Sequence, residues 1–310
     1  MKAVRVVAYG GPEVLQVEEV PMPTVGPGQL LLKVIACGIN PLDAWFRSGH
    51  LAPRFPRPMP YTPGADVVGT VVERGEGATT FAEGDTVMGV LPVICDGGYA
   101  EYTVVDEVRM TALPDGLDPV MAAASMTPAI TGIQMAEKAL SLGPCKRMLI
   151  IGALGGVGRA AVVTAMAQGV DVTVSVRPGR EDAARELGVQ QVVTSDDAAR
   201  PEALGGSFDA VLDLVGPEHV VPWEGAISPG GNVVSVVPVP PAPYSRSDVS
   251  FTPFAYSPDA ASAKKVAAML LDGSLTMPEI EVLGLDETGK AHAVLPGKAA
   301  GRKFVIVPAG

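Results

Sequence analysis

The chain has few of the residues that hold metals or form disulfides. Its 310 residues include three cysteines and three histidines, and Cys37, Cys95 and Cys145 lie far apart in the sequence. Structural zinc sites take four Cys or His ligands, and disulfide scaffolds need many cysteines in a short chain. The composition therefore excludes a disulfide-based fold, and we expect buried thiols and no bound metal.

Positive charge and long apolar runs are also scarce. Lys and Arg number 23 against 34 Asp and Glu, which gives a formal net charge of −11. Such a chain is not suited to bind nucleic acid or anionic membranes. Although 47% of the residues are hydrophobic, no stretch approaches the roughly 18 apolar residues of a membrane span, and residues 1–10 lack the features of a signal peptide. We therefore predict a cytoplasmic protein without nucleic-acid or membrane partners.

The segment from Met148 to Val162 passes from an apolar stretch through clustered glycines into small residues, and a second β-like stretch follows at 170–176. This is the spacing of a βαβ unit. Glycines at such a turn let the backbone approach a diphosphate, which binds at the N-terminus of the following helix. The alternative is an ordinary turn between strand and helix. The predicted dinucleotide site comprises Gly155, Gly156, Val157 and Gly158.

The end of the second strand indicates which dinucleotide binds. NAD-preferring sites place a carboxylate about 20 residues after the glycines, whereas a 2′-phosphate requires a nearby arginine. This chain has Ser175 at that position, followed by Arg177 and Arg180. A hydroxyl and two guanidinium groups suit a phosphate, so the predicted cofactor is NADP(H). Alternatively, both arginines are solvated charges paired with Glu181 and Asp182.

The pattern of expected elements changes along the chain. Up to about residue 120, short β-like runs alternate with Gly/Pro clusters, which is typical of a partly open β-barrel. The next part alternates strands and helices and predicts a doubly wound parallel sheet. The predicted fold is therefore α/β, with a barrel-like domain of residues 1–121 and 259–310 and a Rossmann domain of residues 122–258.

The expected elements can be given by residue range. In the first part we expect strands at 3–8, 29–36, 67–73, 86–90 and 100–105. In the second we expect strands at 147–151, 172–176, 191–193, 210–214 and 232–236, with helices at 119–140, 158–167 and 181–187. A helix at 260–271 and a strand at 303–307 are expected to return to the first domain.

Four segments together resemble a known family. The chain contains Gly-Ile-Asn-Pro-Leu-Asp at 38–43, Pro-Gly-Ala-Asp-Val-Val-Gly at 63–69, Gly-Gly-Tyr-Ala-Glu-Tyr at 97–102 and the glycine cluster at 155–158. This set is similar to the zinc-independent medium-chain dehydrogenases/reductases, in the quinone oxidoreductase (zeta-crystallin-like) branch. The resemblance covers essentially the whole chain. It implies a GroES-like catalytic domain, no zinc, and NADPH-dependent hydride transfer to a quinone or an α,β-unsaturated carbonyl compound.

The resemblance also implies roles for individual residues. Asn40 would position the nicotinamide or donate to a substrate carbonyl, or else cap its own turn. Asp43 would orient a substrate or a water, or merely pair with Arg47. The hydroxyl of Thr127 would approach the cofactor, and it could also cap the helix that continues after Pro128. Further cofactor-binding positions implied by the resemblance are Val215, Ser235, Arg302 and Lys303.

The chain departs from the family pattern at the acceptor pocket. Quinone reductases of this branch usually carry Tyr where this chain has Trp45 and near where it has Leu51. The indole N–H is no practical acid. The proton of the product would therefore come from water, which we favour, or from Tyr61 or His50. The predicted acceptor pocket comprises Trp45, His50, Leu51 and Tyr61.

Two other functions stay open. An enoyl-thioester reductase would use basic residues such as Arg47, Arg54 and Arg57, which are otherwise solvated charges of a proline-rich loop. A non-catalytic NADPH-binding protein would turn over no quinone or enone. Relatives commonly pair through a sheet edge, and the apolar strand at 232–237 is the expected edge of a homodimer.

Overall fold

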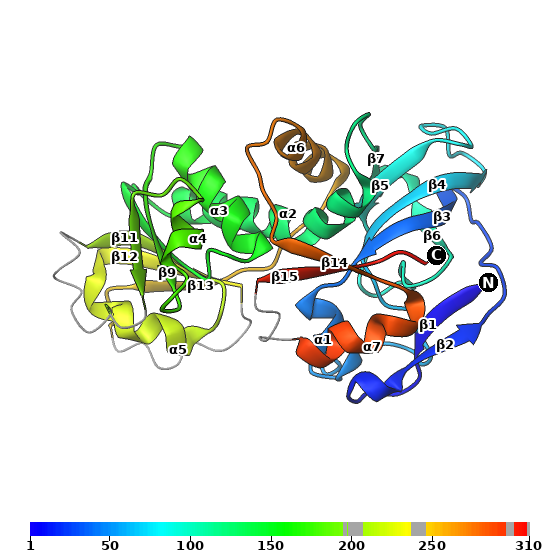
Figure 1. The fold of residues 1–310 in the computed structure, drawn as a ribbon, viewed down its shortest axis with the longest axis horizontal. Coiled ribbons are helices and arrows are strands. Elements are labelled where there is room, and N and C mark those ends of the chain that lie inside the picture. Colours follow the sequence, from blue (N-terminus) through cyan, green and yellow to red (C-terminus); the bar gives the residue numbers. More distant parts are fainter. Residues whose placement is uncertain (195–196, 198–206, 237–245, 296–300, 309–310) are drawn as a thin grey trace. The chain divides into compact units, whose positions relative to one another are not determined.

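The computed structural model describes residues 1–194, 197, 207–236, 246–295 and 301–308. The chain forms two compact units, Met1–Thr127 with Pro258–Gly310 and Pro128–Ser257, and passes from one to the other within helix α2 (Pro119–Ser141) (Figure 1). The prediction placed these boundaries after residues 121 and 258. In the part of the chain that the structure describes, no helix is long and apolar enough to cross a membrane.

A seven-stranded sheet forms the centre of the first unit, in the order β14-β15-β3-β4-β5-β7 with β6 paired to β3. Its strands are β3 (Gln29–Gly38), β4 (Asp66–Arg74), β5 (Thr86–Val90), β6 (Tyr102–Asp106), β7 (Met110–Ala112), β14 (Glu279–Leu283) and β15 (Arg302–Ile306). β3 is the longest, and it pairs with β4, β6 and β15. Its apolar residues are almost all buried in the core. The C-terminal strand β15 therefore belongs to the sheet that β3 begins.

Shorter elements complete this unit. A two-stranded sheet pairs β1 (Lys2–Val6) with β2 (Leu15–Glu19). The helices are α1 (Pro41–Arg47), α6 (Ala260–Leu271) and α7 (Thr288–Val294), with 3-10 turns at Pro12–Val14, Glu107–Arg109 and Leu285–Glu287. Helix α1 begins with Pro41, whose fixed φ and missing N–H suit a first helical position. Its N-cap residue is Asn40.

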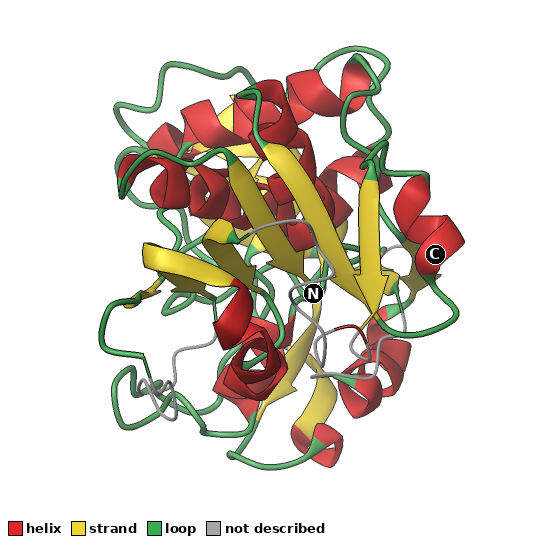
Figure 2. Cartoon of the chain, turned by 90° about the vertical axis from the view of Figure 1, so that its left-hand side faces the viewer, coloured by secondary structure: helices red, strands yellow, loops and turns green. Residues whose placement is uncertain are grey.

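Six parallel strands form the sheet of the second unit, in the order β10-β9-β8-β11-β12-β13. This is the strand order of a Rossmann fold: the chain adds strands toward one edge from β8 to β10, and then toward the other edge from β11 to β13. The strands are β8 (Arg147–Ile151), β9 (Asp171–Val176), β10 (Gln191–Thr194), β11 (Phe208–Asp213), β12 (Ile227–Ser235) and β13 (Ser250–Pro253). The helices are α3 (Gly156–Ala167), α4 (Glu181–Arg185) and α5 (Pro217–Val220), followed by a 3-10 segment at Val221–Ala226 (Figure 1). Figure 2 shows the helices of the chain in red and its strands in yellow.

Alternate residues of β8 enter different cores. Met148 and Ile150 pack in one buried cluster with residues of α3, whereas Leu149 and Ile151 pack in another with Trp223. Because successive side chains of a strand point to opposite faces, the fully apolar run at 147–151 requires cover on both faces. The doubly wound α/β fold predicted from the sequence is therefore confirmed.

One prediction about the sheet was wrong. The strand at 232–236 is not an edge, because β12 lies between β11 and β13 and pairs with both. The edge on that side is β13, a four-residue strand containing Ser250 and Pro253 that has no apolar alternation to reveal it in the sequence. Val237 lies outside the described residues.

Candidate functional site

The glycine cluster of the second unit forms an open turn at the end of β8. Gly152 has φ +94°, and α3 begins at Gly156 after the N-cap residue Gly155. A Cβ atom at Gly158 would lie 2.4 Å from Cα of Ala153, so only glycine lets the helix start this close to the strand. Gly155 is exposed, and Gly156 and Val157 are half-buried. The helix N-terminus therefore presents accessible N–H groups to an anion.

The residues predicted to select the cofactor follow the next strand of the sheet. Ser175 is buried in β9, and its carbonyl accepts a hydrogen bond from Gly152 N–H at 3.3 Å. Arg177 and Arg180 are exposed beyond the end of β9, and neither has an ion-pair partner among the described residues. Asp182 pairs instead with Arg185 at 2.6 Å. The alternative pairing of these two arginines with acidic neighbours is therefore absent from the described structure.

A buried carboxylate shapes the turn after β11. Asp213 Oδ1 accepts hydrogen bonds from the N–H groups of Val215 (3.0 Å) and Gly216 (2.8 Å), and its Oδ2 accepts one from Ser235 Oγ (2.8 Å). A Cβ at Gly152 would lie 2.7 Å from Val215 Cγ2, so this turn lies directly beside the turn after β8. The predicted cofactor residues of this unit thus meet at the carboxyl ends of adjacent parallel strands, where α/β sheets bind their ligands.

The first unit contains a group of polar side chains that are nine-tenths or more buried, which we call the buried polar cluster. They come from β3, α1, β4, the segment before β6, α2, α7 and β15, or from residues flanking these elements. Burial of so many polar groups is costly unless they bind one another. The buried polar cluster comprises Asn40, Asp43, Asp66, Tyr99, Thr127, His292 and Lys303.

Asp66 accepts the largest number of hydrogen bonds in this cluster. Its Oδ1 accepts from both the N–H (3.1 Å) and the Oγ1 (2.5 Å) of Thr127, and its Oδ2 accepts from Asn40 Nδ2 at 2.8 Å. The other side of the Asn40 amide, Oδ1, accepts from Lys303 Nζ at 2.6 Å, and that ammonium also donates to the carbonyl of Ile39 at 2.7 Å. Asn40 therefore connects a buried carboxylate to a buried ammonium.

Asn40 and Thr127 have structural roles in the first unit. Asn40 is the N-cap residue of α1 in a capping box with Asp43, and its amide also binds Asp66 and Lys303. Thr127 is not an N-cap, because α2 runs continuously through Pro128. Its hydroxyl binds Asp66.

Asp43 lies beside these residues and binds a second chain of polar groups. Its Oδ2 accepts hydrogen bonds from Asn40 N–H (2.8 Å) and from Tyr99 Oη (3.1 Å). The Tyr99 hydroxyl also lies 3.4 Å from His292 Nε2, and the two rings meet edge to face. The ion pair of Asp43 with Arg47 is not present among the described residues. Asp43 is therefore held by uncharged donors.

Burial controls the titration of the cluster. It raises the pKa of Asp43 to about 6, with a contribution from Asp66, while the hydrogen bonds to Asp43 act in the opposite direction. It also raises the pKa of Asp66 and lowers that of Lys303, and the attraction between these two charges opposes both changes. Burial, together with Arg47, lowers the pKa of His292 to about 3, so this imidazole is neutral at physiological pH.

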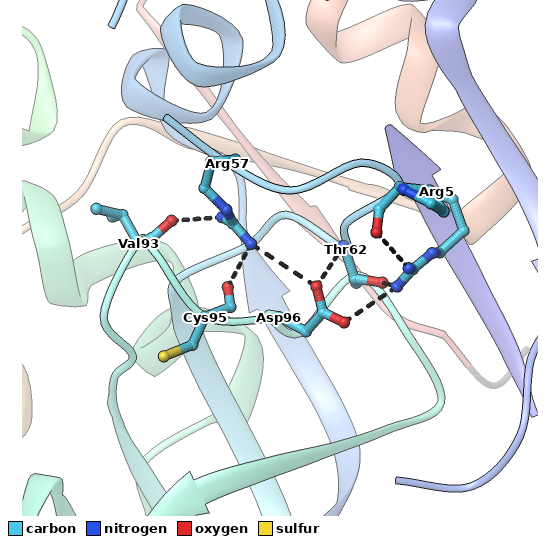
Figure 3. Close-up of polar contacts among 7 residues, drawn as sticks. Arg5, Arg57, Thr62, Val93, Cys95 and Asp96 are labelled. Atoms are coloured by element: carbon cyan, nitrogen blue, oxygen red, sulfur yellow. Dashed lines mark hydrogen bonds and ion pairs between the residues drawn. The ribbon is translucent and has the colours of Figure 1, made fainter. Parts of the chain in front are cut away.

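Asp43 also lines a pocket in the first unit. The pocket is lined by Asp43, Phe46, Arg57, Tyr61, Pro63, Gly64, Ala65, Pro92, Val93 and Cys95. Two segments of its wall are joined by Arg57, which donates to the carbonyls of Val93 and Cys95 and lies 3.7 Å from Asp96 (Figure 3). Asp96 in turn pairs with Arg5 at 3.1 Å. These contacts fix the segment around Arg57 to the segment at 93–96.

Only part of the predicted acceptor pocket lines this cavity. Tyr61 is 1% exposed, lines the pocket and stacks beneath the guanidinium of Arg57, whose central carbon lies 3.9 Å from the ring centroid. Trp45 and Leu51 are half-buried and His50 is exposed, and none of the three is among the lining residues.

Two of the three arginines considered for thioester binding are buried, although the sequence suggested an exposed loop. Arg47 and Arg57 are 5% and 8% exposed, so the description of both as solvated loop charges is wrong. Helix α1 buries Arg47, and backbone carbonyls bind Arg57. Arg54 is exposed. Lys303, expected at the cofactor, binds Asn40 within the cluster, and Arg302 pairs with Glu281 at 2.8 Å.

Sequence reasoning missed Asp66, Tyr99 and His292. Asp66 and Tyr99 lie within two of the segments that carry the family resemblance, and a polar residue inside a run of glycines and apolar residues was the available signal. Nothing in the sequence around His292 marks it, because its partner Tyr99 is far away in the chain. The described residues contain no group of three or more His, Cys, Asp or Glu side chains placed to hold a metal ion.

Comparison with known proteins agrees with this architecture. Residues 26–115 match the alcohol dehydrogenase GroES-like domain family. The chain is 32% identical to the quinone oxidoreductase of Homo sapiens over 243 residues, which cover 76% of this chain and 73% of that protein. Its fold matches the quinone oxidoreductase of Coxiella burnetii with a TM-score of 0.86 at 24% identity over 99% of both chains. It also matches the CurK enoyl reductase with a TM-score of 0.85 at 21% identity over 99% of both chains.

A GroES-like unit joined to a Rossmann unit defines an oxidoreductase of the medium-chain dehydrogenase/reductase class, whose quinone oxidoreductases use a nicotinamide cofactor and a small-molecule substrate. Within this class, the chain belongs to the zinc-independent quinone oxidoreductase family.

Proposed function

We propose that this protein is an NADPH-dependent reductase of quinones and α,β-unsaturated carbonyl compounds. The observation that supports this most directly is the glycine turn of the second unit, where Gly155 is exposed and Gly158 leaves no space for a Cβ atom, in a chain 32% identical to a quinone oxidoreductase. In the first unit, the buried carboxyl group of Asp43 lines a small pocket. Conjugated acceptors are flat and largely apolar, and their carbonyl group already polarises the double bond. Their reduction therefore needs a hydride, a fixed position and a source of one proton.

The residues of the second unit fit the dinucleotide. The exposed turn at Gly155 and the N–H groups at the start of α3 suit a diphosphate, and the close contact at Gly158 leaves space only for a glycine. Arg177 and Arg180, which are exposed and without ion pairs in the described chain, suit the 2′-phosphate of NADPH. When bound, the cofactor supplies the hydride.

Cofactor choice can be tested by titration. NADPH should bind at least about tenfold more tightly than NADH, a difference of roughly 1.4 kcal/mol or more. Ser175→Asp should shift the preference toward NADH, because a carboxylate repels the 2′-phosphate and accepts from ribose hydroxyls. Asp182→Asn is the matched control, since this exposed residue pairs with Arg185. Equal affinities of the unmodified protein for the two cofactors would refute the assignment.

Turnover tests the reaction itself. NADPH oxidation should be followed with a naphthoquinone, a cyclic enone and an enoyl-coenzyme A thioester. We expect turnover of the first two. Faster turnover of the thioester would favour the enoyl-thioester reductase, although Arg47 and Arg57 are buried and cannot form the basic surface that this substrate would use. Tight NADPH binding with no turnover of any acceptor would indicate a binding protein.

A further inference from the structure

The hydrogen bonds of Asp43 distinguish its two oxygens. Asn40 N–H and Tyr99 Oη both donate to Oδ2, whereas no described residue donates to Oδ1. The side chain is 7% exposed and lines the pocket. Because two donor hydrogens already point at Oδ2, a proton on this carboxyl group belongs on Oδ1. Oδ1 is therefore the oxygen left free to carry an exchangeable proton.

His292 determines the direction of the Tyr99 hydrogen bond. The Tyr99 hydroxyl has one hydrogen, which it donates to Asp43, so its oxygen must accept from Nε2 of the neutral His292. The imidazole then carries its hydrogen on Nε2, and Nδ1, which has no hydrogen-bond partner among the described residues, is the unprotonated nitrogen. The order of donation is thus His292 to Tyr99 to Asp43.

We propose that Asp43 is the proton donor to the reduced acceptor, and that Tyr99 and His292 are positioning residues that keep its proton on Oδ1. The inference rests on the proposed reduction of quinones and enones. It replaces water, the source favoured from the sequence, with a residue that the fold places at the pocket.

The proton balance of this step is complete. The acceptor gains two electrons and one hydrogen as hydride, which leaves an enolate or a hydroquinone anion. The Oδ1–H bond of Asp43 then breaks, its proton forms the new bond on the anion, and the electron pair stays on the carboxylate. Solvent returns a proton to Oδ1 when the product leaves. No further oxidant or reductant is needed.

The surroundings of Asp43 suit this exchange near neutral pH. Burial and the charge of Asp66 on β4 raise its pKa to about 6, while Lys303 on β15, Asn40 N–H and the Tyr99 hydroxyl lower it. The Cys37 thiol of β3 and the Tyr61 phenol also interact with this carboxyl group, and the pKa of each is raised by it. His292 is faced by Arg47 and by Tyr99.

The test compares Tyr99→Phe with the unmodified protein at saturating NADPH and naphthoquinone. Loss of the Tyr99 donor removes a hydrogen bond that favours the ionised form, so the pKa of Asp43 should rise by about half a unit to one unit. The pH at which kcat declines should rise by the same half to one pH unit, with little change in KM. Tyr102→Phe, a half-buried tyrosine on β6, is the matched control and should leave the profile in place.

Two further measurements separate a catalytic from a structural role. Asp43→Asn should lower kcat by about a hundredfold and abolish the decline of kcat at high pH. NMR of the carboxyl carbons should show that Asp43 in the unmodified protein titrates near pH 6 and shifts in Tyr99→Phe, and nitrogen NMR should show His292 as the neutral Nε2–H form at pH 7.

The outcomes are distinguishable. If Tyr99→Phe shifts the carboxyl titration but leaves the kcat profile in place, Asp43 is not the donor, although the reductase activity stands. An Nδ1–H form of His292 would overturn the order of donation whether or not the protein has activity. If the unmodified protein turns over none of the acceptors, the proposed function fails, and the donor role fails with it.

Discussion

Replacing Asp66 by asparagine should destabilise the first unit, and the structure shows why no local adjustment can prevent it. Asp66 accepts from the Thr127 N–H and hydroxyl at one oxygen and from the Asn40 amide at the other. An asparagine has only one oxygen. If that oxygen faces Thr127, its NH₂ group faces the NH₂ group of Asn40, and turning Asn40 over would point a donor at the Lys303 ammonium.

The expected loss follows from these contacts. Leaving one buried donor without an acceptor costs about 1–3 kcal/mol, and losing the negative charge that attracts the buried Lys303 ammonium through Asn40 costs up to about 3–5 kcal/mol. Since the two effects share the same groups, we expect Asp66→Asn to lose about 3–5 kcal/mol in total. For a unit of this size, the midpoint of thermal unfolding should fall by about 10 °C.

Urea and thermal unfolding measure this loss, and a double variant tests its cause. Adding Lys303→Met removes the buried ammonium whose charge Asp66 no longer offsets, so the double variant should recover about half of the lost stability. The control is Asp106→Asn, because Asp106 is half-exposed and pairs with Arg109 at 3.7 Å, a contact worth about 0–1 kcal/mol. A loss below about 1 kcal/mol for Asp66→Asn, or no recovery in the double variant, would refute this account of the cluster.

Three further predictions follow from the same structure. Gly158→Ala should lower the thermal midpoint because a Cβ there lies 2.4 Å from backbone, whereas Gly155→Ala should not, because its nearest atom is 3.8 Å away; equal midpoints would contradict this. The pKa of Asp43 is about 6 in the folded protein, against an ordinary value of 3.8, so its contribution to stability is largest at low pH and is lost as pH rises through 6. The free energy of unfolding of Asp43→Asn, relative to that of the unmodified protein, should therefore rise by about 2–3 kcal/mol from pH 4 to pH 8. If urea unfolding gives the same difference between the two proteins at both pH values, this prediction is wrong. We also expect a homodimer, formed through the exposed edge strand β13 (Ser250–Pro253), and a monomeric mass in light scattering at micromolar concentration would exclude it.

Sequence patterns predicted the regular elements well where local chemistry is decisive. The strands at 86–90 and 147–151 and the helix at 260–271 were predicted with the bounds that the structure has. Each is a run of mostly apolar residues that stops at or just before a glycine, a proline or a charged residue: Gly152 after the strand at 147–151, Pro92 near the end of the strand at 86–90, and Asp272 after the helix. Short elements without an apolar run, including β13 and α7, were missed.

The candidate sites also include one part that local sequence predicts and another part that it does not. The dinucleotide turn could be read from the sequence, because strand, glycines and helix are consecutive and their geometry depends on local backbone freedom at positions such as Gly152 and Gly158. Asn40, Asp43 and Tyr61 could be named from the family resemblance, but not their partners. Trp45 and His50 were named with them and do not line the described pocket.

By itself, the sequence determined the α/β class, the two-part organisation and the position of the glycine turn, since these depend on periodicity and on residues adjacent in the chain. Only the tertiary structure decided which polar groups meet. His292 reaches Tyr99, and Lys303 reaches Asn40, because β15 and α7 return to a sheet begun by β3. Hydrogen bonds between residues hundreds of positions apart leave no local pattern, and the titration of Asp43 depends on the burial that this return creates.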